Sequence, residues 1–323
     1  MSGIASGCSA RILAAVTFHF RESRLQFLFR VVRALAEYPV DAVDLVVITN
    51  VDNHPEINKI KQLCEPLFEF SPVHISSTKS FSIESFPSLS DPWLLPWCHK
   101  HLIKDNFIAT NAPYTHFIYI EDDILLSYEN FMYFLHYRER LKSQRLIPSF
   151  QRIEYNTDDN RLYLLDQIAV SNFGARKRVE MDGYAFVNLD YPYNAMYILD
   201  LDLALEYVNS RSSDRELSRA VQPGWDIACR SAMGLCFEDP PPGFKHRYVS
   251  PVNPKTLTTP CWSWVYHIAN NYSTDWYYPF AKTRVDQLFA FQETRSSWRP
   301  PPKFMQYLHR LRRKITRAPA LAK

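Results

Sequence analysis

The chain has 323 residues, 46% of them apolar, which is enough to bury one large core or two fused half-domains. Its formal net charge is only +3, which excludes a surface built as a whole to bind nucleic acid. With 7 glycines, 22 prolines and 15% aromatic residues, the composition argues against glycine-rich phosphate loops and favours irregular segments lined with rings.

The cysteines and the N-terminal residues bear on the compartment. The cysteines are scattered without a C-x-x-C pair or zinc-like spacing, which favours free thiols in a reducing compartment. Residues 1–10 show no basic segment followed by an apolar run, and no later segment approaches a membrane-spanning length without charges. We therefore expect a cytoplasmic protein.

The first part of the chain alternates between strand and helix patterns. Residues 11–19 form a short apolar, β-branched run, and residues 21–38 show helical spacing that ends at Pro39. Residues 43–49 are almost continuously apolar, as in a strand covered on both faces. This β-α-β order predicts an α/β fold with a parallel sheet of the doubly wound, nucleotide-binding kind.

The following segments lead to a group of acids. We expect helices over 57–67, 93–108 and 128–141, a Ser/Pro-rich loop over 70–90 and a strand over 115–121. That strand runs directly into Glu121, Asp122 and Asp123. Ligands of open α/β sheets bind beyond the carboxyl ends of the strands, which is where these acids fall.

The second half is more mixed and is divided by prolines. We expect strands over 149–154, 161–170 and 184–189 and helices over 200–208 and 216–233. Residues 303–317 combine apolar side chains with a dense basic run. This tail is compatible with an amphipathic helix on the anionic inner face of a cell membrane, and equally with a solvated end of the chain.

The three acids suggest a metal. A nucleoside diphosphate would be repelled by adjacent carboxylates unless a divalent cation bridged the two, and Mg²⁺ or Mn²⁺ often takes only one or two carboxylates, with water and phosphate completing its shell. On their own, however, acids at a strand end are also common as solvated caps. The buried-type strand before them and the aromatic helix after them favour the metal site.

Residues 117–134, FIYIEDDILLSYENFMYF, resemble the DxD-type segment of GT-A glycosyltransferases, particularly the N-acetylglucosaminyltransferase I type. There an apolar strand, the triplet EDD, a short apolar turn and a Phe-x-x-Phe helix follow one another. The resemblance implies a GT-A-like mixed sheet with helices on both faces, and a Mn²⁺ or Mg²⁺ ion held by Asp123. The resemblance is limited to this segment and to the β-α-β pattern that precedes it.

Other site residues follow from the same resemblance. An acceptor-side carboxylate opens a helix after the DxD half of GT-A enzymes, which points to Asp226 in QPGWD, although Asp226 is equally suited to be a simple N-cap. A late histidine often completes the metal shell, which makes His267 and His246 candidates, although both also suit a buried structural role. Alternatively, Lys245, His246 and Arg247 form a cationic lip, a group of positive charges at the edge of the site that neutralises the leaving diphosphate.

Donor contacts are expected near the ends of the first two strands. Arg21 or Arg24 would contact phosphates, Asn50 or Asp52 would read the base, and Asp122 and Glu121 would support the donor. Lys100, on the helix before the acidic strand, is a further candidate. Ordinary loop or surface polarity explains the loop and helix residues of this set equally well.

The sequence therefore predicts a metal-dependent and inverting glycosyltransferase that moves a sugar from a nucleotide donor, with a UDP-sugar favoured, to a glycan or lipid-linked acceptor. Residues 1–145 would bind the nucleotide sugar, 146–300 the acceptor, and 301–323 would form the tail. The alternatives are a nucleotidyltransferase or sugar-phosphate transferase, which the absence of glycine after the first strand disfavours, and a non-catalytic carbohydrate-binding protein.

Overall fold

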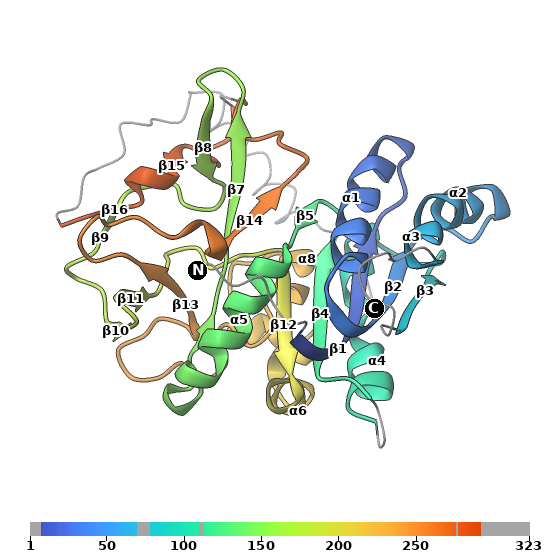
Figure 1. The fold of residues 1–323 in the computed structure, drawn as a ribbon, viewed down its shortest axis with the longest axis horizontal. Coiled ribbons are helices and arrows are strands. Elements are labelled where there is room, and N and C mark those ends of the chain that lie inside the picture. Colours follow the sequence, from blue (N-terminus) through green and yellow to red (C-terminus); the bar gives the residue numbers. More distant parts are fainter. Residues whose placement is uncertain (1–7, 70–77, 110–112, 276, 292–323) are drawn as a thin grey trace, which may run out of the picture.

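The computed structural model describes residues 8–69, 78–109, 113–275 and 277–291 (Figure 1). The predicted basic tail, 301–323, lies outside these residues. All six cysteines lie within them and are free thiols. No helix in the described part of the chain is long and apolar enough to cross a membrane.

The largest sheet confirms the predicted α/β class. Its order is β12-β4-β1-β2-β3, with β1, β2, β3 and β4 parallel and β12 antiparallel to β4. The bounds of these strands are β1 Cys8–Phe18, β2 Val40–Thr49, β3 Thr78–Ser85, β4 His116–Glu121 and β12 Met196–Asp200. Since β12 belongs to the second half of the chain, the boundary expected near residue 145 does not separate two independent sheets.

Strand β3 corrects the sequence interpretation, which assigned 70–90 to a loop. β3 lies at the edge of the sheet, and its residues alternate between exposed and half-buried. Serines and short polar residues interleave with Phe81 and Ile83, so the apolar signal is too sparse to predict a strand. Residues 70–77 of that expected loop lie outside the described residues.

Helices cover both faces of the main sheet. On one face the His116 ring meets Phe131 of α5 at 5.2 Å between centroids, and Tyr38, just after α1, also packs on Phe131. On the other face Tyr119 stacks on His99 at 3.9 Å, just before α4. The helices are α1 Leu25–Ala36, α2 His54–Cys64, α3 Pro66–Glu69, α4 Lys100–Leu102, α5 Tyr128–Leu141 and α6 Leu201–Val208.

Two predicted helices are broken into shorter pieces. The segment expected over 93–108 consists of a 3₁₀ helix Pro92–Trp97, α4 and a π-helical turn Ile103–Phe107. The segment expected over 216–233 consists of α7 Ser218–Val221 and α8 Ile227–Ser231. Pro96 lies inside the first segment, and Pro223-Gly224 interrupts the second, so the apolar spacing overestimated helix length.

The rest of the second half forms smaller sheets beside the main one (Figure 1). One has the order β15-β8-β7-β14-β5 and another β10-β11-β13-β6, while β9 pairs with β16. Their bounds are β5 Ile124–Leu125, β6 Ile147–Pro148, β7 Gln151–Asn156, β8 Arg161–Leu164, β9 Ser171–Asn172, β10 Arg178–Met181, β11 Tyr184–Val187, β13 Tyr248–Val252, β14 Trp264–His267, β15 Thr283–Arg284 and β16 Phe289–Ala290.

The predicted strand over 161–170 ends early, at Leu164, and β12, β13 and β14 were not predicted. Strand β14 matters most for the site, because it pairs in parallel with β7 and antiparallel with β5, the short strand that follows the acids. It thereby brings residue 267 next to residue 124.

Candidate functional site

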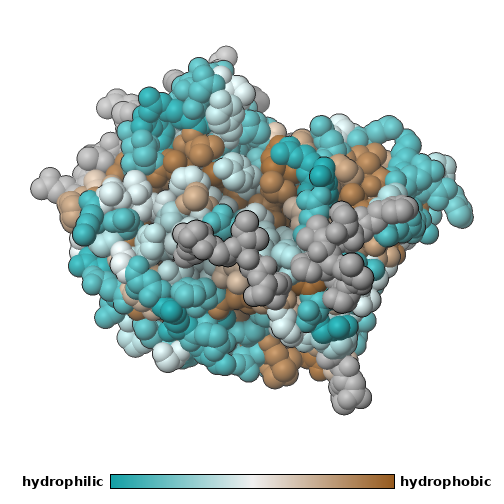
Figure 2. All heavy atoms as spheres, in the orientation of Figure 1, coloured by the Kyte–Doolittle hydropathy of each residue, from teal (hydrophilic) through white to brown (hydrophobic). Residues whose placement is uncertain are grey.

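A cleft of about 440 Å³ opens at the carboxyl ends of β1 and β4. Thr17 pairs with Glu121 in the last register position of the two strands, so both chain segments leave the sheet at the same edge. Figure 2 shows the molecule hollowed between the part with β7 and β8 and the part with α1, with apolar residues on both sides. The cleft is lined by Thr17, His19, Arg21, Arg24, Pro92, Trp93, Leu95, Pro96, Glu121, Asp122, Tyr193, Ala228 and Cys229.

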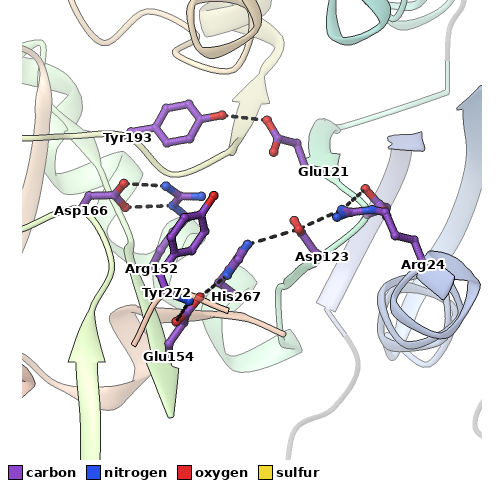
Figure 3. Close-up of polar contacts among 10 residues, drawn as sticks. Arg24, Glu121, Asp123, Arg152, Glu154, Asp166, Tyr193, His267 and Tyr272 are labelled. Atoms are coloured by element: carbon purple, nitrogen blue, oxygen red, sulfur yellow. Dashed lines mark hydrogen bonds and ion pairs between the residues drawn. The ribbon is translucent and has the colours of Figure 1, made fainter. Parts of the chain in front are cut away.

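All three acids at the end of β4 have side-chain partners, and the two aspartates share one of them, Arg24. Figure 3 shows the contacts of Glu121 and Asp123. Tyr193 donates a hydrogen bond of 2.8 Å from its hydroxyl to Glu121. Asp122 accepts two hydrogen bonds from Arg24, at 2.8 and 2.7 Å. Asp123 accepts a third from Arg24, at 2.9 Å, and faces His267. Both aspartates are buried, so they are not the solvated caps that a surface turn would carry.

His267 links Asp123 to a second buried carboxylate. Its Nε2 lies 3.2 Å from Asp123 Oδ2, and its Nδ1 lies 2.5 Å from Glu154 Oε1. The other oxygen of Glu154 accepts the backbone N–H groups of Tyr272 and Ser273 at 3.0 and 2.6 Å. This chain of contacts fixes both the position and the ring orientation of His267 (Figure 3).

The electrostatics of this chain follow from burial and pairing. Burial lowers the pKa of His267, but its hydrogen bonds to Asp123 and Glu154 outweigh that effect and raise the pKa to about 9. Burial opposes ionisation of Asp123, yet His267 and Arg24 hold the pKa of that carboxyl well below its usual range. At neutral pH His267 is therefore a cation between two carboxylates.

The other two acids are harder to ionise. Burial raises the pKa of Glu121 to about 7, the charge of Asp123 adds to this, and the hydrogen bond from Tyr193 opposes it. Burial also raises the pKa of Asp122, against the lowering effect of the hydrogen bond from Arg24. Glu121 and Asp122 therefore resist ionisation mainly because they are buried, and in the cleft lining they are accompanied by Arg21 and Arg24.

Sequence reasoning missed Arg152, Tyr193 and Glu154, which lie near these acids. Arg152 forms a bidentate pair with Asp166, at 2.9 and 2.5 Å, and its guanidinium carbon lies 4.5 Å from the centroid of the Tyr193 ring. Tyr193 in turn bonds Glu121. Of this group only Glu154 left a signal in the sequence, as an acid at the end of a predicted strand. Tyr193 and Arg152 reach the site from segments whose pairing the sequence does not reveal.

Asp123 and His267 fit a divalent cation as two protein ligands. A carboxylate on the second ring nitrogen, here Glu154, is the usual companion of a metal-bound histidine. In the described residues no group of three or more His, Cys, Asp and Glu side chains is arranged to hold a metal. The remaining ligands would therefore have to come from substrate oxygens and water, as is common for Mg²⁺ and Mn²⁺. Binding at Nε2 would displace the proton that His267 carries there.

The predicted donor contacts are only partly brought to the cleft. Arg21 lines it, as expected. Asn50 instead accepts the Phe20 N–H at 2.8 Å, and neither Asn50 nor the exposed Asp52 lines the cleft. The expected donor contact of Lys100 is not seen either, because Lys100 does not line the cleft. Its ammonium donates to the carbonyl of Ser231 at 2.8 Å and to two tyrosine hydroxyls, because the turn of helix that carries it faces the interior.

His246 does not belong to a cationic lip. Asn188 donates to its Nδ1 at 3.2 Å, and its Nε2 donates to the Leu189 carbonyl at 2.8 Å. The ring is buried and its pKa is lowered to about 4 by that burial, so it is neutral. Its basic neighbours Lys245 and Arg247 form ion pairs with Asp190 and Glu206. The prediction of a phosphate-binding group here is wrong.

Asp226 is the N-cap of α8, accepting the Cys229 N–H at 2.7 Å. Its second oxygen accepts a hydrogen bond from the thiol of Cys229, at 3.3 Å. Since Cys229 lines the cleft and Asp226 is exposed, the carboxylate lies at the cleft rim. The capping role is therefore observed, and the acceptor-side role stays a prediction.

The chain is thus an α/β protein whose cleft, at the carboxyl edge of a mostly parallel sheet, is lined by two acids and two arginines, Glu121, Asp122, Arg21 and Arg24. The chain matches no known family model and no curated protein.

Proposed function

We propose that the protein is a glycosyltransferase that uses a nucleotide-diphosphate sugar, with UDP-sugars favoured, and a Mn²⁺ or Mg²⁺ ion. The observation that carries the proposal is the approach of His267 Nε2 to within 3.2 Å of Asp123 Oδ2 at the end of β4. Asp123 follows a strand end, His267 comes from 144 residues later in the chain, and the buried Glu154 holds the second nitrogen of that histidine, as is usual behind a metal-bound imidazole. The resemblance of residues 117–134 to the DxD-type segment of GT-A glycosyltransferases also implies Asp123 as a metal ligand.

The residues of the cleft support the chemistry of sugar transfer. When bound, the cation would neutralise the charge that develops on the departing diphosphate. Arg21 lines the cleft and would hold a phosphate oxygen by charge-assisted hydrogen bonds. Glu121 is held by Tyr193 and offers its second oxygen to a donor hydroxyl.

Asp226 is the proposed acceptor-side carboxylate. It lies at the rim rather than inside the cleft, where an acceptor hydroxyl would arrive from solvent. Its role would be to accept the proton of that hydroxyl as the bond to the sugar forms, which corresponds to an inverting reaction. A glycan or a lipid-linked glycan is the proposed acceptor.

The proposal is tested by incubating the full chain with a panel of nucleotide sugars and Mn²⁺ and measuring release of nucleoside diphosphate, with and without glycan acceptors. We expect one nucleotide sugar to be turned over slowly by hydrolysis and faster with an acceptor, and Asp123→Asn to abolish both. Asp202→Asn, which removes an exposed surface carboxylate, is the matched control. Full activity of Asp123→Asn would refute the proposal, and binding without any turnover would favour a carbohydrate-binding protein.

A further inference from the structure

The guanidinium of Arg24 donates three hydrogen bonds to the acids that follow β4, and one of them goes to Asp123, the proposed cation ligand. Its Nε and Nη2 bind the two oxygens of Asp122 at 2.8 and 2.7 Å, and the same Nη2 binds Asp123 Oδ2 at 2.9 Å. The last oxygen is also the one that faces His267 Nε2 at 3.2 Å. A guanidinium and an imidazole therefore already share the carboxylate oxygen that the cation would need.

A divalent cation and Arg24 cannot hold that oxygen side by side without strong repulsion. The side chains of Asp122 and Asp123 are only 7% and 9% exposed, so little solvent screens the charges around them. Sequence reasoning assigned Arg24 to the phosphates of the donor, and the structure instead shows it on the acids.

We propose, on the basis of the function proposed above, that Arg24 is an internal counterion that keeps the cation out until the donor diphosphate binds. In the free protein the guanidinium neutralises Asp122 and Asp123. When a diphosphate enters, its oxygens offer Arg24 the same bidentate geometry, and Arg24 leaves the acids to the cation.

The surroundings of Arg24 permit this exchange. Its side chain is 28% exposed and lines the cleft, so it can turn toward a ligand without crossing the core. Arg21 lines the same wall, and the Phe27 ring, 5.9 Å from the guanidinium carbon, provides an alternative surface against which Arg24 can rest.

Such an exchange makes the cation and the nucleotide bind cooperatively. Each ligand would improve the affinity of the other by the same factor, since the coupling of two binding equilibria is reciprocal. Direct contact between the cation and the diphosphate would couple the two ligands even if Arg24 never moved, so a permanent pair between Arg24 and the acids predicts the same coupling in wild type and in Arg24→Gln. The exchange predicts that Arg24→Gln weakens the coupling, and an experiment can detect this difference.

The test measures the affinity of the full chain for Mn²⁺ alone by electron paramagnetic resonance, and then for Mn²⁺ with UDP. We expect wild type to bind Mn²⁺ weakly without UDP, and Arg24→Gln to bind it at least ~10-fold more tightly because a competing charge is removed. Arg33→Gln removes a charge from α1, the helix that directly follows Arg24, without touching the acids, and should behave as wild type. UDP should tighten Mn²⁺ binding in wild type and much less in Arg24→Gln.

Arg24→Gln leaves buried carboxylates less neutralised, so its folding is checked by thermal unfolding, and Arg24→Lys serves as a second variant that keeps the charge. Arg24→Lys should bind Mn²⁺ with an affinity between those of wild type and Arg24→Gln. The inference is overturned if Arg24→Gln binds Mn²⁺ no more tightly than wild type while UDP and Mn²⁺ still bind together. If neither protein binds Mn²⁺ with or without any nucleoside diphosphate, the proposed metal-dependent function fails as well.

Discussion

Replacing Glu154 by glutamine tests the support that the structure gives to His267. Glu154 has no exposed side-chain surface and accepts three hydrogen bonds, from His267 Nδ1 at 2.5 Å and from the N–H groups of Ser273 and Tyr272 at 2.6 and 3.0 Å. A glutamine amide has only one oxygen. Its NH₂ group must therefore face either the histidine or the two backbone donors, so that either the His267 Nδ1–H or both backbone N–H groups lose their acceptor.

The magnitude follows from this count. Removing one partner of a buried pair costs about 3–5 kcal/mol, and the retained hydrogen bonds of glutamine place Glu154→Gln near the lower end of that range. A lost carboxylate partner behind a ligating histidine typically weakens metal affinity ~10–100-fold. Both losses have the same cause, because the carboxylate of Glu154 fixes the ring that would bind the cation.

Urea unfolding measures the first quantity, and Mn²⁺ titration of the folded variant in the presence of UDP measures the second. Glu180→Gln, which removes an exposed carboxylate paired with Arg178 on β10, should change neither. An unfolding free energy within ~1 kcal/mol of wild type, together with unchanged Mn²⁺ affinity, would refute the reasoning about His267.

Three further changes test other parts of the structure. Asp226→Asn should keep the cap on α8 and the unfolding free energy nearly unchanged, yet lower transfer to acceptor at least ~100-fold in a product-release assay if the carboxylate is the base. Burial lowers the pKa of His246 to about 4, so the folded protein holds this histidine neutral and the unfolding free energy should fall by up to ~3 kcal/mol as the pH drops from about 6.5 to 4. Urea unfolding at each pH should show a smaller fall of the unfolding free energy for His246→Asn. Gly234→Ala would place a Cβ atom 2.8 Å from the Tyr248 hydroxyl at a φ of +51°, and should lower the unfolding free energy by ~2–5 kcal/mol in thermal or urea unfolding. Gly183→Ala, at a φ of +80° but with open space around the Cβ, should lower it by only ~1–2 kcal/mol.

The parts of the fold that the sequence predicted are those in which local pattern and burial agree. The continuous apolar runs of β1, β2 and β4 are buried on both faces, and the expected helix over 128–141 matches α5. Ser127 and Asn130 form a capping box at its start, which gives that helix a clear local signal. The edge strand β3 lacked such a signal because only half of its surface is covered.

The site was predictable where its residues follow a recognisable strand end, and not where they meet through long-range pairing. Glu121, Asp122 and Asp123 were found because they end β4. The position of His267 depends on β14 pairing with β5 and β7, which the sequence does not encode locally. The roles of Arg152 and Tyr193 also depend on contacts between segments far apart in the chain.

The most direct test of the central claim is calorimetric binding of a panel of nucleoside diphosphates to wild type and Asp123→Ala, each with and without Mn²⁺. The account predicts tight binding of one nucleotide to wild type that requires Mn²⁺ and is lost in Asp123→Ala. Binding that is unaffected by Mn²⁺ or by Asp123→Ala, or no binding to any member of the panel, would contradict a metal-dependent donor site at the end of β4.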